Sequence, residues 1–284
     1  MNSASIVKKG LFALIAIVVA VVAVVISMAF FSPAVVAEEE EEIRYTDAVM
    51  LSRDSDSVVS EYVNYSSMTI TDEVKIAKKV ACYVTELANA CGPIAASNMV
   101  AYYDITYTDL IPNFNPILYM DRYKSSDYAE ADAVINTMYS NMRCNQIQNG
   151  VSEPDYHSGF TAYVQSKGYS ISYPQLVSNG SLDIAALKAQ LNSGHPVSLF
   201  CLGGAIVQIN SYNSNTLLLT NIKFTSNHIA AVYGYQEYTF TMSDGSTRVD
   251  RFVMVSTGWL SPSYAYIALD GSTYIKSATA AVIG

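Results

Sequence analysis

A cysteine followed by glycine and proline stands where the sequence predicts the start of a helix, in the stretch Asn89-Ala90-Cys91-Gly92-Pro93. Proline suits the first turn of a helix, and apolar residues follow at helical spacing. Unpaired main-chain N–H groups and the helix dipole favour a thiolate at such a position, so we expect a lowered pKa for Cys91. Cys91 is therefore a candidate nucleophile. The competing interpretation is an inert cysteine buried in a tight turn.

A cysteine nucleophile needs a base, and the chain has three histidines. We expect a surface or capping role for His157, which lies at the approach to a helix, and a solvent-facing role for His195, which lies in a turn. His228 opens an apolar strand and can project from a rigid sheet into a cleft. It follows Cys91 by 137 residues, inside the ~130–150 window of papain-type enzymes. His228 is the candidate base, with a satisfied core histidine as the alternative.

The elements that must position this pair change in type along the chain. Apolar periodicity and caps predict helices over Pro93–Asp104, Tyr128–Asn141, Gly159–Ser166 and from an N-cap at Ser181 to Gly194. After Pro196, strands are predicted at Val197–Leu202, Thr216–Asn221, Ile229–Tyr235, Tyr238–Met242, Arg248–Ser256, Tyr264–Leu269 and Thr273–Ser277, with hairpin turns at Asp244-Gly245 and Asp270-Gly271. A helical first half and an antiparallel β second half indicate an α+β domain with two lobes and a cleft between them.

Two segments resemble the active-site segments of bacterial papain-like cysteine peptidases related to the bacteriocin leader-processing (double-glycine) peptidases. The nucleophile segment is similar to Asn89–Ala96 with Met99 and Tyr102-Tyr103, and the histidine strand to Asn227–Tyr235. Flanking elements are similar to Gly194-His195-Pro196-Val197 and Gly258-Trp259. The resemblance spans about Lys79 to Tyr274. It implies a papain-like two-lobe fold, with the cysteine at a helix start in a helical N-terminal lobe and the histidine in an antiparallel β C-terminal lobe. It also implies that Cys91 is the nucleophile and His228 the general base and acid of peptide hydrolysis.

The sequence departs from this family where an oxyanion donor is expected. Such enzymes commonly have a Gln five or six residues before the cysteine, whereas this chain has Thr85 and Glu86. Loss of one oxyanion donor costs about 10²–10³ in turnover. We expect the Cys91 main-chain N–H, the Thr85 hydroxyl or the Asn89 side chain to act instead.

A second departure concerns the residue that orients the histidine. An Asn or Asp usually precedes the Gly-Trp element, and here Ser256 and Thr257 occupy these positions. We take Ser256 as the candidate orienting residue, with Thr257 as the alternative and ordinary polar residues at a strand end as the competing interpretation. Because the usual oxyanion donor and the usual histidine-orienting residue are both replaced, a second hypothesis for the whole chain is a surface module that binds peptides without cleaving them.

The N-terminus predicts export. Leu11–Phe31 is an apolar run of 21 residues in which only Ser27 is polar, and it follows Lys8 and Lys9. It is either a signal peptide that ends near Ala37 or an N-terminal membrane anchor with the lysines in the cytoplasm. Both alternatives place the rest of the chain outside the cell or at its surface.

We therefore expect three parts: residues 1–37 as the export segment, 38–78 as an acidic and polar spacer or pro-segment, and 79–284 as the peptidase domain. A peripheral strand is an alternative for part of the spacer. After loss of Lys8 and Lys9, 14 Lys and Arg remain against 25 Asp and Glu, a net charge of −11. This charge disfavours nucleic acid as a partner.

The four cysteines could form two disulfides through any of three pairings. We expect no metal, because Cys-x-x-Cys and His-Glu-x-x-His patterns are absent from the sequence. We also expect no cofactor. The predicted partner is a peptide or protein substrate, with membrane contact only through the N-terminal segment.

Overall fold

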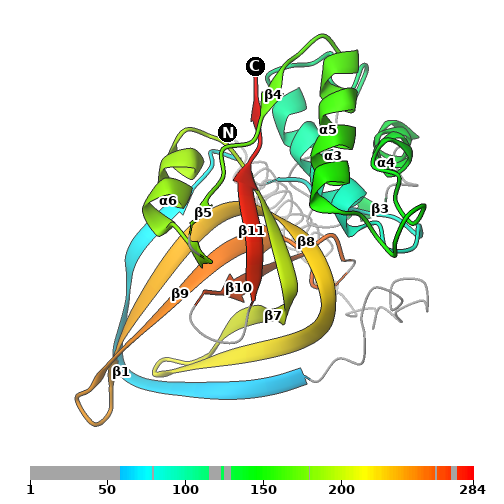
Figure 1. Cartoon of the computed structure of the whole chain (residues 1–284). Helices are drawn as coiled ribbons and strands as arrows, with labels where there is room; N and C mark the ends of the chain where they lie inside the picture. The colour runs from blue at the N-terminus through cyan, green and yellow to red at the C-terminus, as the bar shows by residue number, and fades with distance from the viewer. Residues whose placement is uncertain are drawn as a thin grey trace, which may run out of the picture. The chain divides into compact units, whose positions relative to one another are not determined.

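Four helices lie in the part of the described chain that precedes Val197 (Figure 1). The computed structural model describes residues 58–78, 80–114, 123–124, 129–178, 180–259, 261–269 and 274–284, all within the compact unit Tyr45–Gly284. The helices are α3 (Cys91–Asp104), α4 (Ala129–Asn141), α5 (Glu153–Ser166) and α6 (Ile184–Asn192). The helices predicted from Pro93 and Tyr128 begin within two residues of those positions.

Capping residues explain why two helix starts differ from the sequence prediction. Helix α5 begins at Glu153 rather than at Gly159, because the Ser152 hydroxyl accepts a main-chain N–H of the first turn at 3.2 Å. Helix α6 is capped by Asp183, whose carboxylate accepts a main-chain N–H at 2.9 Å. Ser181, the predicted cap, lies instead in the short strand β6 (Ser181–Leu182).

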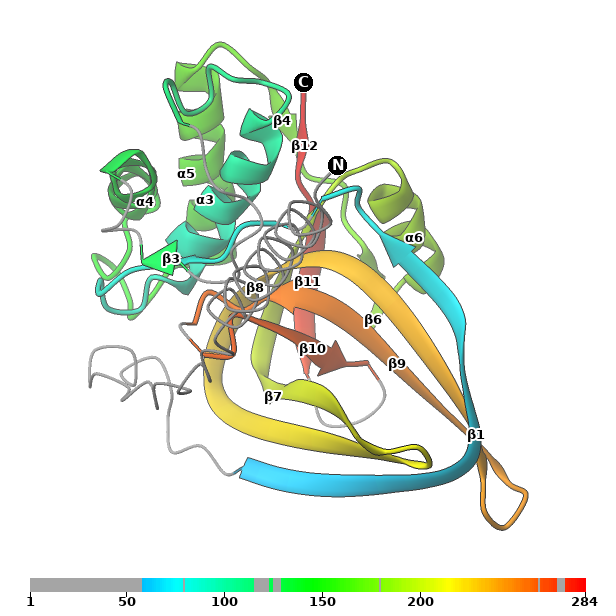
Figure 2. The same ribbon diagram turned by 180° about the vertical axis from the view of Figure 1, so that it is seen from behind.

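Helix α3 is the central helix of the described chain. It packs against α4, α5 and the long strand β8 (Thr216–Met242), and both views show α3, α4 and α5 side by side (Figures 1 and 2). Nearly all of its residues are buried. Most of them are apolar, and the buried polar side chains are hydrogen bonded, as when Asn98 accepts the main-chain N–H of Tyr83 at 2.9 Å. Small residues such as Ala95 and Ala96 let the neighbouring elements approach closely. The first residue of this central helix is Cys91.

The main sheet has six strands in the order β1-β8-β9-β10-β7-β11, with a further pairing of β8 and β7. Besides β8 they are β1 (Val58–Lys75), β7 (Val197–Asn213), β9 (Thr247–Ser256), β10 (Tyr264–Ala268) and β11 (Ile275–Ala280). Three predicted strands between Thr216 and Met242 are one continuous strand, because β8 bends without ending. Short two-stranded pairings join β2 (Tyr83–Val84) to β3 (Tyr123–Lys124), β5 (Val177–Ser178) to β6, and β12 (Val282–Ile283) to β4 (Ile171–Ser172).

The predicted turn at Asp244-Gly245 joins β8 to β9. Gly245 has φ +83°, and the Asp244 carboxylate accepts the main-chain N–H of Ser246 at 2.9 Å. The other predicted turn, Asp270-Gly271, lies outside the described residues.

Strands β7, β8, β9 and β10 form a closed ring of pairings. Strand β7 pairs with β8 and β10, and β9 pairs with the same two strands. Strand β1 extends the closure by pairing with both ends of β8, so that Asn64 lies opposite Thr216 and Tyr65 opposite Met242. Alternate residues point inward and form a second buried apolar cluster of Val63, Tyr65, Val207, Leu217, Leu219, Tyr238, Phe240 and Phe252. Residues 58–75 are thus a strand of the sheet, which was one alternative for the polar segment expected to end at residue 78.

The apolar run Leu11–Phe31 and the acidic stretch Glu38–Glu42 lie outside the described residues. Of the helices that the structure describes, none combines the length and the hydropathy needed to cross a bilayer.

Candidate active site

Cys91 lies at the start of α3, where no side chain caps the helix. The main-chain N–H groups of Cys91 and Gly92 are free of capping side chains, and Pro93 has no N–H. All four cysteines have free thiols, and Cys91 is half-buried whereas Cys82, Cys144 and Cys201 are buried. Of the four thiols, that of Cys91 is therefore the most accessible, as the sequence prediction of a nucleophile requires.

Gly92 allows a close approach that any larger residue would prevent. A Cβ atom at this position would lie 2.4 Å from Cγ1 of Val151 and 3.3 Å from Cδ1 of Ile229. Both distances are shorter than normal carbon–carbon contacts, and the β-branched valine has little freedom to move away. Gly92 thus brings the nucleophile segment against Val151 and against the residue that follows His228.

His228 projects from the bent middle of β8 and is buried. Its Nε2 atom lies 2.9 Å from the main-chain carbonyl oxygen of Thr257. A carbonyl oxygen can only accept, so Nε2 carries the proton and the neutral ring keeps its lone pair on Nδ1. Nδ1 is therefore the nitrogen that can take a proton from a thiol.

Aromatic side chains enclose the imidazole of His228. Trp259 packs against it with 4.7 Å between ring centroids, and Phe224 meets it edge to face at 5.6 Å. Burial lowers the pKa of His228 to about 4, although the hydrogen bond to the Thr257 carbonyl opposes this. The imidazole is consequently neutral at pH 7.

Cys91 and His228 line the same cavity, of about 410 Å³. The main-chain N–H of Ile229, next to His228, acts to lower the pKa of the Cys91 thiol, against the larger effect of burial. Within the described chain no direct hydrogen bond joins this sulfur to the imidazole, a looseness that is common where no substrate is bound. Uncharged side chains make up the rest of the wall: Asn89, Gln148, Asn149, Gly150, Val151, Ser226, Asn227 and Ile229.

The pKa of the Cys91 thiol differs from the sequence prediction. Burial raises it, and hydrogen bonds from the main-chain N–H groups of Ile229, Gly92 and Cys91 only partly oppose this. The prediction of a lowered pKa considered the helix N-terminus alone and was wrong, because desolvation by the surrounding structure is the larger effect. The site holds a neutral thiol and a neutral imidazole at pH 7.

The hydroxyl of Ser256 does not reach the imidazole. It donates to the main-chain oxygen of Ala81 at 2.8 Å and so joins the end of β9 to the segment before β2. The Thr257 hydroxyl also points elsewhere, donating to the main-chain oxygen of Pro262 at 2.6 Å. The orienting group of His228 is thus the Thr257 main chain, rather than the side chain of either predicted residue.

Of the predicted oxyanion donors, Asn89 and Cys91 line the cavity, whereas Thr85 does not. The Thr85 hydroxyl accepts the main-chain N–H of Leu87 at 3.4 Å. Asn89 has φ +54° and donates through Nδ2 to Oδ1 of Asn145 at 3.0 Å, which leaves its second Nδ2 hydrogen available. Of the three predicted donors, the Cys91 main-chain N–H and the Asn89 amide are therefore the two that belong to residues of this cavity.

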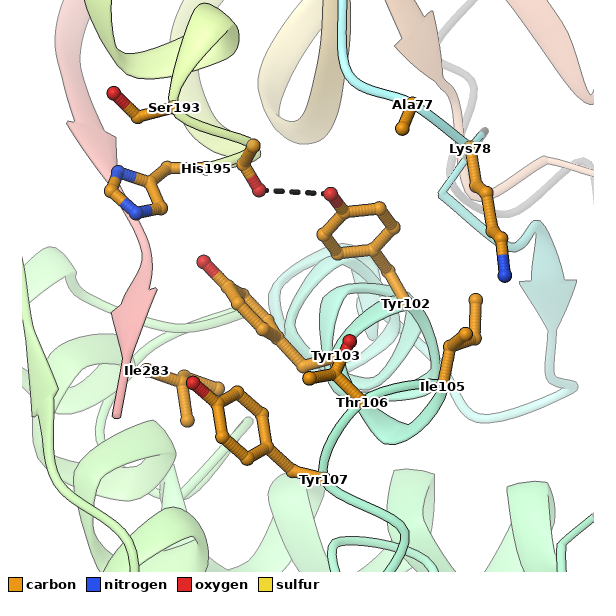
Figure 3. Close-up of a pocket in the computed structure, with 11 residues that line it drawn as sticks. Ala77, Lys78, Tyr102, Tyr103, Ile105, Thr106, Tyr107, Ser193, His195 and Ile283 are labelled. Carbon is orange, nitrogen blue, oxygen red and sulfur yellow. Dashed lines mark hydrogen bonds between the residues drawn. The ribbon is translucent and has the colours of Figure 1, made fainter.

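The other two histidines lie outside this cavity. His157 Nε2 is 3.1 Å from the Thr279 hydroxyl, and its ring packs on Tyr173. His195 lines a separate cavity of about 310 Å³, together with Tyr102 and other residues from the C-terminal end of α3, the end opposite Cys91 (Figure 3). Of the three histidines, only His228 shares a cavity with Cys91.

Sequence reasoning missed the wall formed by the loop between α4 and α5. Asn145 has φ +60°, and its Oδ1 accepts both Asn89 Nδ2 and the Gly150 main-chain N–H, the latter at 2.7 Å. Its Nδ2 donates to the main-chain oxygen of Ala88 at 2.9 Å. The clustering of amide side chains with a glycine between two predicted helices was the signal available in the sequence.

The α+β fold, with a helix-start thiol and a strand-borne imidazole on one cavity, has the features of a thiol-hydrolase class. Residues 71–260 match the sequence profile of the Peptidase_C39 like family. The chain belongs to this family, which is related to the bacteriocin-processing C39 peptidases, and the family implies a cysteine peptidase that acts on a peptide or protein. Searches of curated proteins and of solved structures found no match. Among the described residues, no three His, Cys, Asp or Glu side chains are grouped to hold a metal ion.

Proposed function

We propose that this chain is a cysteine peptidase that hydrolyses peptide bonds with Cys91 as nucleophile and His228 as general base and acid. The observation that carries the proposal is the shared cavity, which is lined by a half-buried cysteine and by a histidine with its lone pair on Nδ1. The cysteine on a helix and the histidine on a sheet correspond to the two lobes of a papain-like fold.

The proposed reaction starts from the neutral pair. The Nδ1 atom of His228 takes the proton of the Cys91 thiol as the sulfur attacks the peptide carbonyl. The oxygen of the tetrahedral intermediate accepts hydrogen bonds from the Cys91 main-chain N–H and the Asn89 amide. His228 then gives the proton to the leaving amine, which departs and leaves a thioester on Cys91. Water, deprotonated by His228, attacks the thioester, and the proton returns to the thiolate when the acid product leaves.

The uncharged wall of the cavity supports a neutral, extended peptide as substrate. The side chains of Asn89, Gln148, Asn149 and Asn227 offer both donors and acceptors. Such groups can hydrogen bond to the main chain of a peptide, whereas a charged substrate side chain would enter this cavity without an opposite charge in its wall.

A second function is favoured by one specific observation. The half-buried Cys91 has a thiol with a raised pKa and, within the described chain, no hydrogen bond to the imidazole, which is the arrangement expected of a module that binds peptides without cleaving them. Cleavage of a peptide library by the purified protein, compared with Cys91→Ala and Cys91→Ser, separates the two functions. A peptidase loses cleavage in both variants, whereas a binding module retains peptides in all three proteins and releases no products.

We further propose that residues 1–37 export the chain, with Leu11–Phe31 as a signal peptide or a membrane anchor. Cell fractionation tests this proposal: export predicts the protein in the medium or in the membrane fraction, accessible to external protease. Mass spectrometry of the mature N-terminus distinguishes cleavage near Ala37 from retention of the anchor.

A further inference from the structure

A main-chain oxygen orients the candidate base of this site. The carbonyl of Thr257 accepts the Nε2–H of His228 at 2.9 Å, where related enzymes are expected to use a carboxylate or an amide side chain. Because no residue type defines the position of a carbonyl oxygen, the loop that follows β9 must hold it in place. The contacts that fix this loop therefore decide how well His228 is oriented.

We propose that the hydroxyl of Thr257 is the positioning group of the site, because it holds the turn that carries the Thr257 carbonyl and the main chain of Trp259, the two residues that fix His228. The proposal rests on the proposed function for the identity of His228 as base. Thr257 touches no reacting atom in the proposed reaction and acts only through these two neighbours.

The hydrogen bonds of Thr257 carry the argument. Its side chain is completely buried. Oγ1 donates to the Pro262 carbonyl at 2.6 Å and accepts the main-chain N–H of Trp259 at 3.0 Å. The main-chain N–H of Thr257 donates to the Ser263 carbonyl at 2.9 Å. The Thr257 hydroxyl thus donates one hydrogen bond and accepts another. These two bonds close the turn that carries the Thr257 carbonyl oxygen.

The same hydroxyl controls two sides of the imidazole. The carbonyl of Thr257 meets the ring edge at Nε2. Trp259, whose main-chain N–H donates to Oγ1, packs its indole on the ring face. Loss of the hydroxyl would leave the main-chain N–H of Trp259 and the carbonyl of Pro262 each without this partner. The hydrogen bond of His228 to the Thr257 carbonyl and its packing against Trp259 would then both loosen, because both depend on the Thr257 hydroxyl.

The neighbouring Ser256 does not share this role. Its hydroxyl donates to the Ala81 carbonyl at 2.8 Å and connects the strand end to the segment before β2. Cys82 in that segment donates to the Ser263 carbonyl at 3.1 Å. These contacts support the base of the loop from outside, whereas the Thr257 hydroxyl lies inside the turn.

The test compares Thr257→Val, which keeps the shape but removes the hydroxyl, with Thr257→Ser, which restores it. Thr279→Val is the matched control, because Thr279 is also buried and its hydroxyl also contacts a histidine, His157 at 3.1 Å, outside the cavity. We expect Thr257→Val to lower kcat for a cleaved peptide about ten-fold or more with KM within about two-fold. Thr257→Ser should recover most of the loss, and Thr279→Val should leave kcat unchanged.

The pH profile and the histidine tautomer give readouts that a purely structural role would not move. The Thr257 carbonyl raises the pKa of His228, so the acid limb of kcat/KM should shift to lower pH in Thr257→Val. The other titratable groups near the site are the thiols of Cys91, Cys82 and Cys144 and the hydroxyl of Tyr156. Burial raises the pKa of each of them, so none titrates in that limb. Nitrogen-15 NMR should show His228 as the Nε2–H tautomer in the wild type and a mixture of tautomers in Thr257→Val.

Each outcome decides the proposal. A Thr257→Val protein that melts at lower temperature but keeps kcat, pH profile and tautomer would overturn it. If that variant does not fold, an Nδ1–H tautomer of His228 in the wild type would overturn it equally well. The NMR result does not depend on turnover, so the two proposals can fail separately. If cleavage survives in Cys91→Ala while NMR still shows the Nε2–H tautomer of His228, the proposed function is refuted and the positioning role of Thr257 stands.

Discussion

The imidazole of His228 packs against the indole of Trp259, with 4.7 Å between the ring centroids and 36° between the planes. This contact removes one face of the histidine from water. The other neighbours are Phe224 and the Thr257 carbonyl, so the ring is surrounded by groups that do not stabilise a positive charge as well as water does. The folded protein therefore keeps a neutral histidine to an unusually low pH.

The buried histidine makes stability depend on pH. The pKa of His228 is about 4 in the folded protein, against an ordinary value of 6.5. Between these values the unfolded chain binds a proton that the folded chain does not, so this contribution to stability is present above pH 6.5 and is lost as pH falls to 4. The loss corresponds to about 3 kcal/mol. Chemical denaturation at several pH values measures it.

The variant His228→Gln isolates this contribution from those of other groups. Glutamine can still donate an N–H to the Thr257 carbonyl but does not titrate. The difference in unfolding free energy between the two proteins should change by about 3 kcal/mol between pH 6.5 and 4. His195→Gln, at the other cavity, is the matched control. Parallel pH curves for wild type and His228→Gln would show that His228 is not buried in its neutral form.

Alkylation of the thiols tests the protonation state of Cys91. Because burial raises its pKa, the rate of iodoacetamide labelling in the free protein should still be rising above pH 9, the ordinary thiol value. Cys91 should react before the buried Cys82, Cys144 and Cys201. Peptide mapping after timed labelling identifies the site. A plateau in the Cys91 rate below pH 8 would indicate a thiolate–imidazolium pair and contradict the neutral pair.

The pair of residues that share the cavity, Cys91 and His228, could be selected from the sequence because each has a local signal. Cys91 precedes Gly92 and Pro93 at a helix start, and His228 opens an apolar strand. The pKa of Cys91 could not be predicted in this way. It depends on desolvation by β8 and the α4–α5 loop, which are remote in sequence.

Two further features had no local signal. A main-chain carbonyl exists at every residue, so nothing in the sequence distinguishes that of Thr257. The prediction therefore fell on the polar side chain of Ser256.

Strand β1 could not be predicted with certainty because most of its side chains are exposed and polar. Only its inward residues Val63 and Tyr65 are buried, and they pack against strands more than 140 residues away in sequence.

Ser256→Ala distinguishes the predicted role of this residue from the observed one. The Ser256 hydroxyl donates to Ala81 and not to His228. We expect the variant to lose about 1–2 kcal/mol of unfolding free energy, because a buried carbonyl loses its partner. Its acid limb of kcat/KM should stay at the wild-type pH. A shifted limb with unchanged stability would restore Ser256 as the residue that orients the histidine.

Gly258→Ala tests the turn between the orienting oxygen and Trp259. Gly258 has φ +71°, and an added Cβ would lie 3.0 Å from Cγ2 of Ile94 on α3. The left-handed backbone costs about 1–2 kcal/mol for alanine, and the contact should also displace the turn and reduce kcat. Gly168→Ala is the control, since φ is +86° there and an added Cβ meets nothing within 4 Å. Equal kcat in the two variants would mean that the contact with Ile94 does not matter.

Asn145→Ala tests whether the α4–α5 loop holds the nucleophile segment. The Asn145 Oδ1 atom accepts from the Asn89 amide at 3.0 Å and the Gly150 N–H at 2.7 Å, and Nδ2 donates to the Ala88 carbonyl at 2.9 Å and the Tyr139 hydroxyl at 2.6 Å. Because it is exposed and has a left-handed backbone, we expect a modest loss of about 1–2 kcal/mol in unfolding free energy. The larger effect should be on turnover, a fall of about five-fold or more in kcat/KM, since Asn89 loses the partner that aims its remaining amide hydrogen. Asn145→Asp keeps the acceptor for Asn89 and Gly150 but not the donor to Ala88 and Tyr139, so it should retain most of the activity. Equal activity losses in the two variants would show that the contacts of Nδ2 with Ala88 and Tyr139, rather than the orientation of Asn89, position Cys91.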